Sequence, residues 1–321
     1  MKLTGTDIGV GVLAGLAAAL LSIGLANQSI IGFLLVLFTP LPIFIAALGW
    51  GTITGFIAAA TMTIAVYVIS PSLDAVADIL LMAVPAATGA YFIGLARPAA
   101  EIGGPKDVFV WYPLADTLLR LCLVIAVGVI IIGALIGEAQ MSALVQAVTK
   151  QMNETNPQLA ANPEVGQLLV RIMLRLMPII ASAAFVMSIV ANLYVALRIT
   201  AAAGKLQRPR DDWPRALRLP RPALVIFAIA CAMAFLPGAP GYVGSTVAGA
   251  VGAGFSMAGF AMLHARSRGA TWRPFALWFA YTCALIFSFT LIIFLLAGLF
   301  DTSRNAPVSK AEIKTPPNND N

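Results

Sequence analysis

The sequence predicts an all-α fold, a polytopic transmembrane helical bundle, from three observations. Of its 321 residues, 60% are hydrophobic and only 11% are charged, and the mean hydropathy is +0.91. A soluble domain carries about 25% charged residues, so this chain has too little polar surface to cover a water-soluble body. Its apolar residues come in long blocks rather than on single faces of amphipathic helices. Half of its 20 basic residues lie in two short connections between these blocks, residues 198–221 and 266–273. Taken together, the low charged fraction and the long apolar blocks indicate that the chain is solvated by lipid.

The first apolar block covers residues 8–26 and follows a short N-terminal segment with one lysine. Its 19 residues are enough to cross the roughly 30 Å hydrocarbon layer at about 1.5 Å per residue. The apolar core of a signal peptide is usually shorter, about 7–15 residues. We therefore expect a retained first helix, with a cleaved signal peptide as the alternative.

Eight further spans follow in a single helical domain that we place at residues 1–300. They are expected at residues 30–48, 51–69, 77–96, 114–136, 175–197, 222–236, 242–264 and 274–299. The segment 222–236 is short and ends at Pro237-Gly238, a strong turn signal, so eight spans in total are the alternative to nine.

The distribution of lysine and arginine predicts the orientation of the spans. With a cytoplasmic N-terminus, 13 basic residues fall on the inner side of the membrane and 5 on the outer side. This excess is typical of cytoplasmic connections. Nine spans then place the C-terminus outside, whereas eight would return it to the cytoplasm.

Three connecting or terminal segments are long enough for their composition to predict a structure or a role. The outer segment 137–174 has apolar residues at helical spacing over 141–152, which predicts an amphipathic helix in the membrane interface. Asn162, Pro163 and Glu164 are typical of an N-cap, a proline at the first helical position and an early acid, which predicts a helix that continues into the span 175–197. The inner segment 198–221 is basic, and the tail 301–321 has the polar composition of a disordered segment.

The chain has almost none of the residues from which catalytic or metal sites are built. Its three cysteines, Cys122, Cys231 and Cys283, form no C-x-x-C pair, and His264 is the only histidine. No phosphate-binding loop or serine-hydrolase motif is present. We therefore expect no enzymatic activity, no cofactor and no metal. We also expect no nucleic-acid partner, because the net charge of +6 is explained by the basic connections that set the membrane topology.

Asp116 and Arg120 lie four residues apart near the start of the span 114–136, so they share a helix face. Each charge at a helix centre costs about 2.5–3.5 kcal/mol on insertion scales. We therefore expect an intramembrane ion pair, with Arg120 reaching towards the cytoplasmic interface.

A candidate substrate-binding set lies towards the outer side. Asp74 and Asp78 share one helix face, Arg171 and Arg175 share another, and Asn192 is an amide in the middle of a span. These side chains could line the mouth of an outward-facing cavity. The alternatives are interface anchoring for the charges and an interhelical hydrogen bond for Asn192.

Two further features concern helix packing. Pro40 and Pro42 interrupt the helical hydrogen bonds of the second span, which is tolerated where protein or a cavity covers the freed carbonyls. Small residues at four-residue spacing, among them Ala14 and Ala18, allow helices to approach closely. Such pairs serve either internal packing or the docking of another membrane protein.

The segments Phe38–Pro42, Gly49–Gly51, Gly259–His264 and Gly298–Asp301 resemble those of the YybS-like family of predicted bacterial membrane proteins, whose function is unknown. More distantly, the first six spans are similar to the substrate-binding components of energy-coupling-factor transporters. That resemblance implies docking of a membrane coupling subunit at Ala14 and Ala18.

Together these features lead us to expect a multi-pass protein of the bacterial cytoplasmic membrane, in contact with membrane lipid and of unspecified oligomeric state. The expected function is of the transport type: binding of a small solute or lipid in an outward-facing cavity, energised by a separate ATPase. The alternative is a non-enzymatic membrane scaffold in cell-envelope or cell-shape assembly.

Overall fold

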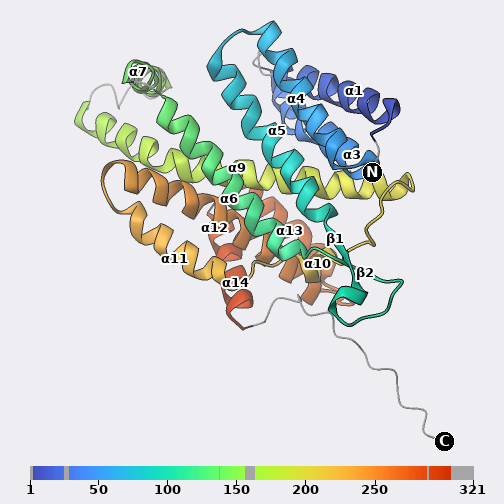
Figure 1. Ribbon diagram of the computed structural model, residues 1–321. Helices are drawn as coiled ribbons and strands as arrows, with labels where there is room; N and C mark the ends of the chain where they lie inside the picture. Colours follow the sequence, from blue (N-terminus) through green and yellow to red (C-terminus); the bar gives the residue numbers. More distant parts are fainter. Residues whose placement is uncertain (1–2, 25–28, 137, 156–162, 288, 305–321) are drawn as a thin grey trace, which may run out of the picture.

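The computed structural model describes residues 3–24, 29–136, 138–155, 163–287 and 289–304. The described chain is almost entirely helical, which confirms the all-α class (Figure 1). Seven of its described helical segments are long and apolar enough to cross a membrane. They cover Gly5–Ser22, Ile30–Trp50, Thr52–Ile69, Leu73–Gly94, Leu114–Leu135, Glu164–Ala202 and Gly238–Arg266.

The first helices form one group on one side of the long helix α9 (Figure 1). They are α1 (Gly5–Ser22), α2 (Ile30–Leu37), α3 (Pro40–Trp50), α4 (Thr52–Ile69) and α5 (Leu73–Gly94). Helix α1 packs on α4 through small residues: a Cβ added to Gly15 would meet the carbonyl oxygen of Ala58. Without a side chain at Gly15, the two helices approach closely.

The expected proline interruption divides the second span into α2 and α3. Pro40 and Pro42 lack the backbone N–H groups that would extend the helix from α2. The N–H groups of Phe38 and Thr39 instead bond three residues back, to Leu35 and Val36. Pro40 has no N–H to offer the carbonyl of Leu37, and the N–H of Leu41 bonds to Phe38, so the Leu37 carbonyl is left without a helical partner.

Between α5 and α6 lies a small antiparallel hairpin that the sequence pattern did not predict. Strands β1 (Ala96–Pro98) and β2 (Phe109–Trp111) flank the short 3-10 helix η2 (Ala99–Ile102). Ala96 pairs with Trp111, so the end of α5 and the start of α6 are held side by side.

Helices α6 (Leu114–Leu135), α7 (Glu138–Thr155) and α9 (Pro163–Ala202) follow. Helix α7 covers the segment in which an amphipathic helix was expected, and Asn162 lies outside the described residues. Helix α9 begins at Pro163, as expected for a helix that continues into the span 175–197, and it ends later than expected, at Ala202, so Arg171 and Arg198 both belong to it. Residues 198–202, expected in the basic connection, are therefore helical.

A second group of helices lies on the other side of α9 (Figure 1). It contains α10 (Trp213–Ala216), α11 (Pro222–Ala234), α12 (Gly238–Arg266), α13 (Arg273–Ile286) and α14 (Thr290–Arg304). Helix α12 is central to this group and packs against α6, α9, α11 and α14. Small residues make this contact possible: a Cβ on Gly249 would meet α9 at Ile179, and one on Gly259 would meet α14 at Phe294.

The expected ninth span, residues 274–299, is wrong as a single helix. It breaks after Ile286 into α13 and α14, whose 14 and 15 residues give each a length of only about 21–23 Å. At the end of α14, Asp301 pairs with Arg218 at 3.0 Å and with Arg266 at 3.8 Å. Arg218 lies on the basic connection before α11 and Arg266 is the last residue of α12, so α14 ends on the basic face and not on the opposite side. Residues 301–304 are helical, which corrects the expected start of the tail.

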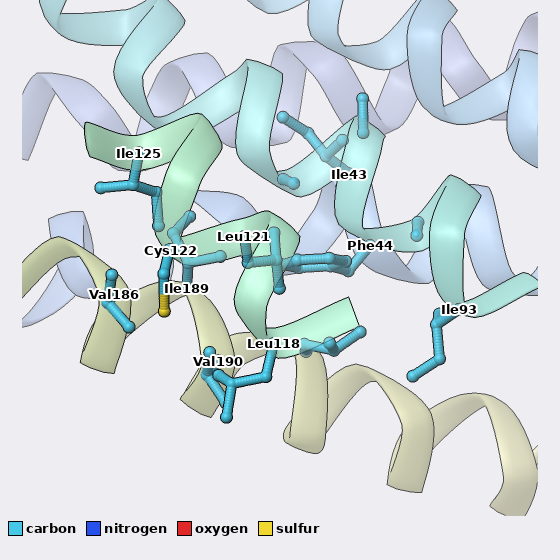
Figure 2. Close-up of a cluster of buried hydrophobic side chains, with 14 of the residues drawn as sticks. Ile43, Phe44, Ile93, Leu118, Leu121, Cys122, Ile125, Val186, Ile189 and Val190 are labelled. Carbon is cyan, nitrogen blue, oxygen red and sulfur yellow. The ribbon is translucent and has the colours of Figure 1, made fainter. Parts of the chain in front are cut away.

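Large buried side chains join the first group of helices to α6 and α9 (Figure 2). Phe44 of α3 points toward Leu121 of α6, and Ile189 of α9 lies close by with Cys122. Outside this core, large apolar side chains such as Leu13 (69% exposed) and Leu285 (86% exposed) face outward. Such an apolar exterior suits lipid and not water.

A candidate binding pocket on the basic face

A pocket of about 590 Å³ lies where the β-hairpin, the start of α6 and the basic connection before α11 meet. We call it the arginine pocket. It is lined by Leu95, Ala96, Arg97, Val110, Trp111, Tyr112, Pro113, Leu114, Ala115, Arg208, Asp211, Ala216 and Arg218. Three arginines and one aspartate therefore face an otherwise apolar and aromatic lining.

Arg208 is the structural centre of the arginine pocket. It is only 7% exposed, and its Nη1 atom donates hydrogen bonds to the carbonyl oxygens of Ile93 at 3.0 Å and Tyr112 at 2.7 Å. Its Nε and Nη2 atoms donate to the carboxylate of Asp211 at 2.7 and 2.9 Å. Because Ile93 belongs to the last turn of α5, the guanidinium satisfies a helix-terminal carbonyl and complements the helix dipole.

Arg218 approaches the arginine pocket from the connection between α10 and α11. Its Nε atom lies 3.0 Å from Asp301, and its side chain is 19% exposed. The next residue, Leu219, is 1% exposed and packs beside Gly254 of α12. The position of Arg218 is therefore set by a buried neighbour; the residue lines the pocket, and its guanidinium pairs with Asp301.

Arg97 and Arg120 are the exposed cations near the arginine pocket. Arg97 lies on β1, and within the described part of the chain its side chain has no hydrogen bond or ion pair. Arg120 interacts electrostatically with Asp116 but, among the described residues, forms no salt bridge with it. Its guanidinium instead lies over the rings of Phe92 and Tyr112, at 4.8 and 5.1 Å, because aromatic faces attract cations near the membrane interface.

A second ionic cluster stabilises the same face. Arg268 donates two hydrogen bonds to the carboxylate of Asp212, one of them at 2.6 Å. These bonds lower the pKa of Asp212 below its ordinary value. Beside this pair, Trp213 packs edge-on against Tyr194 with ring centroids 4.9 Å apart. The arginine-rich connection before α11 is thus folded onto α9 and the end of α12.

The expected outer site is not assembled as one site. Arg175 donates to the carbonyl oxygens of Ala234 and Phe235, both at 3.3 Å, and so caps α11. It lines a pocket of about 380 Å³ between α9, α11 and α12, which Arg171 does not line. Asp74 and Asp78 are exposed on the first turns of α5 and do not line that pocket either. The four charges therefore do not converge.

Asn192 has the interhelical role that the sequence left as an alternative. It is 4% exposed, and its Nδ2 atom donates to the carbonyl oxygens of Leu37 at 2.7 Å and Ser188 at 2.8 Å. The hydroxyl of Ser188 donates to Leu37 as well, at 3.4 Å. The carbonyl freed by the proline interruption is thus satisfied by α9.

The small residues of α1 are used inside the fold. Ala18 is fully buried, and Ala14 is half-buried next to it. Gly11 and Gly15 on the same helix lie against α4. The face of α1 at which a coupling subunit was expected is therefore largely covered by the protein's own helices.

Four residues of this face, Arg97, Arg208, Arg218 and Asp301, were not predicted from the sequence as site residues. The signal for Asp301 was a lone carboxylate at the end of a long apolar run, but its arginine partners are distant in the sequence. Among the described residues, no group of three or more His, Cys, Asp or Glu side chains could hold a metal ion.

These features define the class of the protein. It is an all-helical, multi-pass integral membrane protein with a cationic pocket on its more basic face. The chain belongs to the DUF2232 family of predicted membrane proteins, whose family model matches residues 15–302, more than half of the chain. The resemblance to a membrane protein family of unknown function is thereby confirmed. No curated protein and no solved structure matches the chain, so the similarity to energy-coupling-factor components is not shown.

Proposed function

We propose that this protein is of the transport type and binds a small anionic solute or an anionic lipid headgroup in the arginine pocket. The observation that carries the proposal is the set of three guanidinium groups around one apolar and aromatic cavity. A volume of about 590 Å³ lies within the usual range of small-molecule sites, roughly 300–1,000 Å³.

The position of the arginine pocket supports an amphiphilic ligand. It lies between the end of α5 and the start of α6, where apolar helices give way to polar connections. Trp111 and Tyr112 offer apolar surface beside the cations. A basic cytoplasmic face attracts anionic lipid by about 1 kcal/mol per charge near the surface. The excess of basic residues in these connections favours a cytoplasmic location for this face in a bacterial inner membrane.

The arginine pocket is a better candidate than the outward-facing cavity that we expected from sequence. The pocket beside Arg175 has one cation, which already donates to two backbone carbonyls. The arginine pocket adds Arg97, whose guanidinium has no ion pair with another described residue. A free cation can bind an anionic ligand without first losing another partner.

Transport driven by ATP would need a separate energising protein, because the sequence contains no phosphate-binding loop. We propose a membrane coupling subunit with an ATPase for this role. Since Ala18 is buried, such a subunit would contact the outward side of α1, where Leu13 and Leu20 are exposed. Co-purification of the tagged protein from membranes would test this partner.

The binding proposal is tested by native mass spectrometry of the purified protein with added phosphatidylglycerol or phosphatidylcholine. We expect preferential binding of the anionic lipid and a loss of this preference in Arg97→Gln. Lys106→Gln is the matched control, because Lys106 is an exposed cation in the same connection that does not line the pocket. Equal binding of the two lipids, or equal effects of the two substitutions, would count against the proposal.

A scaffold role in envelope assembly is the second candidate function. Helix α7 favours it, because α7 packs mainly against α9 and exposes polar residues such as Lys150 and Glu154. A deletion strain with altered cell shape and normal solute uptake would support this role. Normal shape with impaired uptake would exclude it.

A further inference from the structure

The carboxylate of Asp301 lies buried between two arginines of unequal exposure. It is 2% exposed, 3.0 Å from Nε of Arg218 and 3.8 Å from Nη2 of Arg266. The Arg218 side chain is 19% exposed and that of Arg266 is 63% exposed. A buried carboxylate is costly unless it is paired, and Arg218 and Arg266 both supply such pairing to Asp301.

Arg218 takes part in two features of the structure at once. It lines the arginine pocket and at the same time pairs with Asp301. An anion that enters the pocket and binds Arg218 must therefore compete with the carboxylate at the end of α14. Arg266 does not line the pocket and offers Asp301 a second partner when it loses the first.

We propose that the ligand of the arginine pocket carries a phosphate group. This phosphate group binds the guanidinium of Arg218 in place of Asp301, and Asp301 is then paired with Arg266 instead. The proposal rests on the proposed function, since it names the chemical class of the ligand and the residue that controls its entry. A guanidinium binds phosphate through two parallel hydrogen bonds, and a phosphate monoester carries more negative charge than a carboxylate. Phosphate can therefore displace Asp301, whereas a carboxylate ligand would only match it.

Arg97 complements this exchange. Its guanidinium has no ion pair in the described structure, so it can contact the same phosphate without breaking a bond. Arg208 keeps its bonds to Asp211, Ile93 and Tyr112 and serves as the fixed wall of the pocket. The end of α14 is thereby coupled to the occupancy of the pocket.

The experiment measures binding to full-length protein in phosphatidylcholine nanodiscs by isothermal titration calorimetry. The probes are dioctanoyl phosphatidic acid, inorganic phosphate and octanoate. We expect both phosphate probes, or the lipid probe alone, to bind more tightly than octanoate. Binding of the lipid probe alone identifies a lipid headgroup as the ligand, whereas binding of inorganic phosphate with equal affinity identifies a free phosphate group.

Two substitutions test the competition in opposite directions. Asp301→Asn removes the competitor, so the affinity for the phosphate probe should rise on the order of tenfold. Arg266→Gln removes the second partner of Asp301, so the same affinity should fall. Lys106→Gln should leave it unchanged. Thermal unfolding of each variant checks that it is folded.

The outcomes separate this inference from the proposed function. If the wild-type protein binds anions but Asp301→Asn leaves the affinity unchanged or lowers it, the inference is wrong and the proposed function stands. The inference is also wrong if octanoate binds as tightly as phosphatidic acid. If neither the wild-type protein nor any folded variant binds an anion, both are wrong.

Discussion

Asn192 of α9 donates a hydrogen bond of 2.7 Å to the carbonyl oxygen of Leu37, 155 positions earlier in the chain. This bond satisfies a carbonyl that the following prolines leave without a helical partner. Within a membrane no water replaces such a bond, so α2 and α3 can be interrupted only where α9 covers the break.

Replacing Asn192 with alanine should destabilise the protein by about 1–3 kcal/mol, because it leaves a buried carbonyl without its strongest donor. Thermal unfolding in detergent would measure the change. Ser188→Ala is the matched control, since its hydroxyl reaches the same oxygen at the longer distance of 3.4 Å. A smaller effect for Asn192→Ala than for Ser188→Ala would contradict this account.

Gly15→Leu should reduce the yield of folded protein and destabilise it by about 1–3 kcal/mol. Even a Cβ at this position would meet the carbonyl oxygen of Ala58, so α1 would have to move away from α4. Gly9→Leu on the same helix should be tolerated, because a Cβ there meets nothing within 4 Å. Size-exclusion profiles and unfolding temperatures of the two variants would compare them. Equal losses would show that close packing of α1 is not the reason.

Arg208→Gln should destabilise the protein by about 3–5 kcal/mol. The substitution removes bonds to two backbone carbonyls and leaves Asp211, whose side chain is 22% exposed, without its partner. Arg210→Gln is the control, because Arg210 is exposed and two residues away in the same connection. Unfolding in denaturant would measure the free energy of unfolding of each variant. Similar values for the two variants would argue against a structural role for Arg208.

The hydrogen bonds between Arg268 and Asp212 should make a small contribution to stability that depends on pH. Because they lower the pKa of Asp212 in the folded protein, the contribution is present above the ordinary value of 3.8. It is lost as the pH falls below 3.8 through the folded pKa. The difference in stability between the wild-type protein and Arg268→Gln should therefore shrink between about pH 5 and about pH 3. A constant difference over that range would contradict the assignment.

The end of α14 should be accessible from the same side of the membrane as the β-hairpin connection. Cysteine at Ser303 and cysteine at Lys106, each in a protein without its native cysteines, should react with an impermeant maleimide from one side only. Cysteine at Lys150 on α7 should react from the other side. Reaction of position 303 together with position 150 would restore a single ninth span and contradict the hairpin of α13 and α14.

The fold could be predicted from sequence where it depends on the length of apolar blocks. Spans such as 51–69 and 114–136 agree with α4 and α6 to within about one residue, since a helix must cross the lipid before its backbone meets water. The interruption at Pro40 and Pro42 also followed from the missing N–H groups. The last span was wrong because hydropathy does not distinguish one long helix from two short helices that fold back.

Most of the candidate site could not be predicted from the sequence. That Arg175 and Asn192 would be important was predictable, because polar groups near or within apolar spans need partners. Their partners, Ala234 and Leu37, were not, since both are backbone carbonyls brought near by the packing of other helices. Arg218 and Asp301 are 83 positions apart and meet only because α14 returns to the basic face.

The sequence alone therefore determined that lipid surrounds this protein, approximately where its helices begin and end, and on which face its basic residues collect. These depend on the free energy of transferring each segment to lipid, which is a local property of the chain. The tertiary structure alone decided which arginines form a pocket, which carboxylate competes for them and on which side the last helix ends. These depend on contacts between distant segments, whose strength is set by distance, burial and geometry in the folded state.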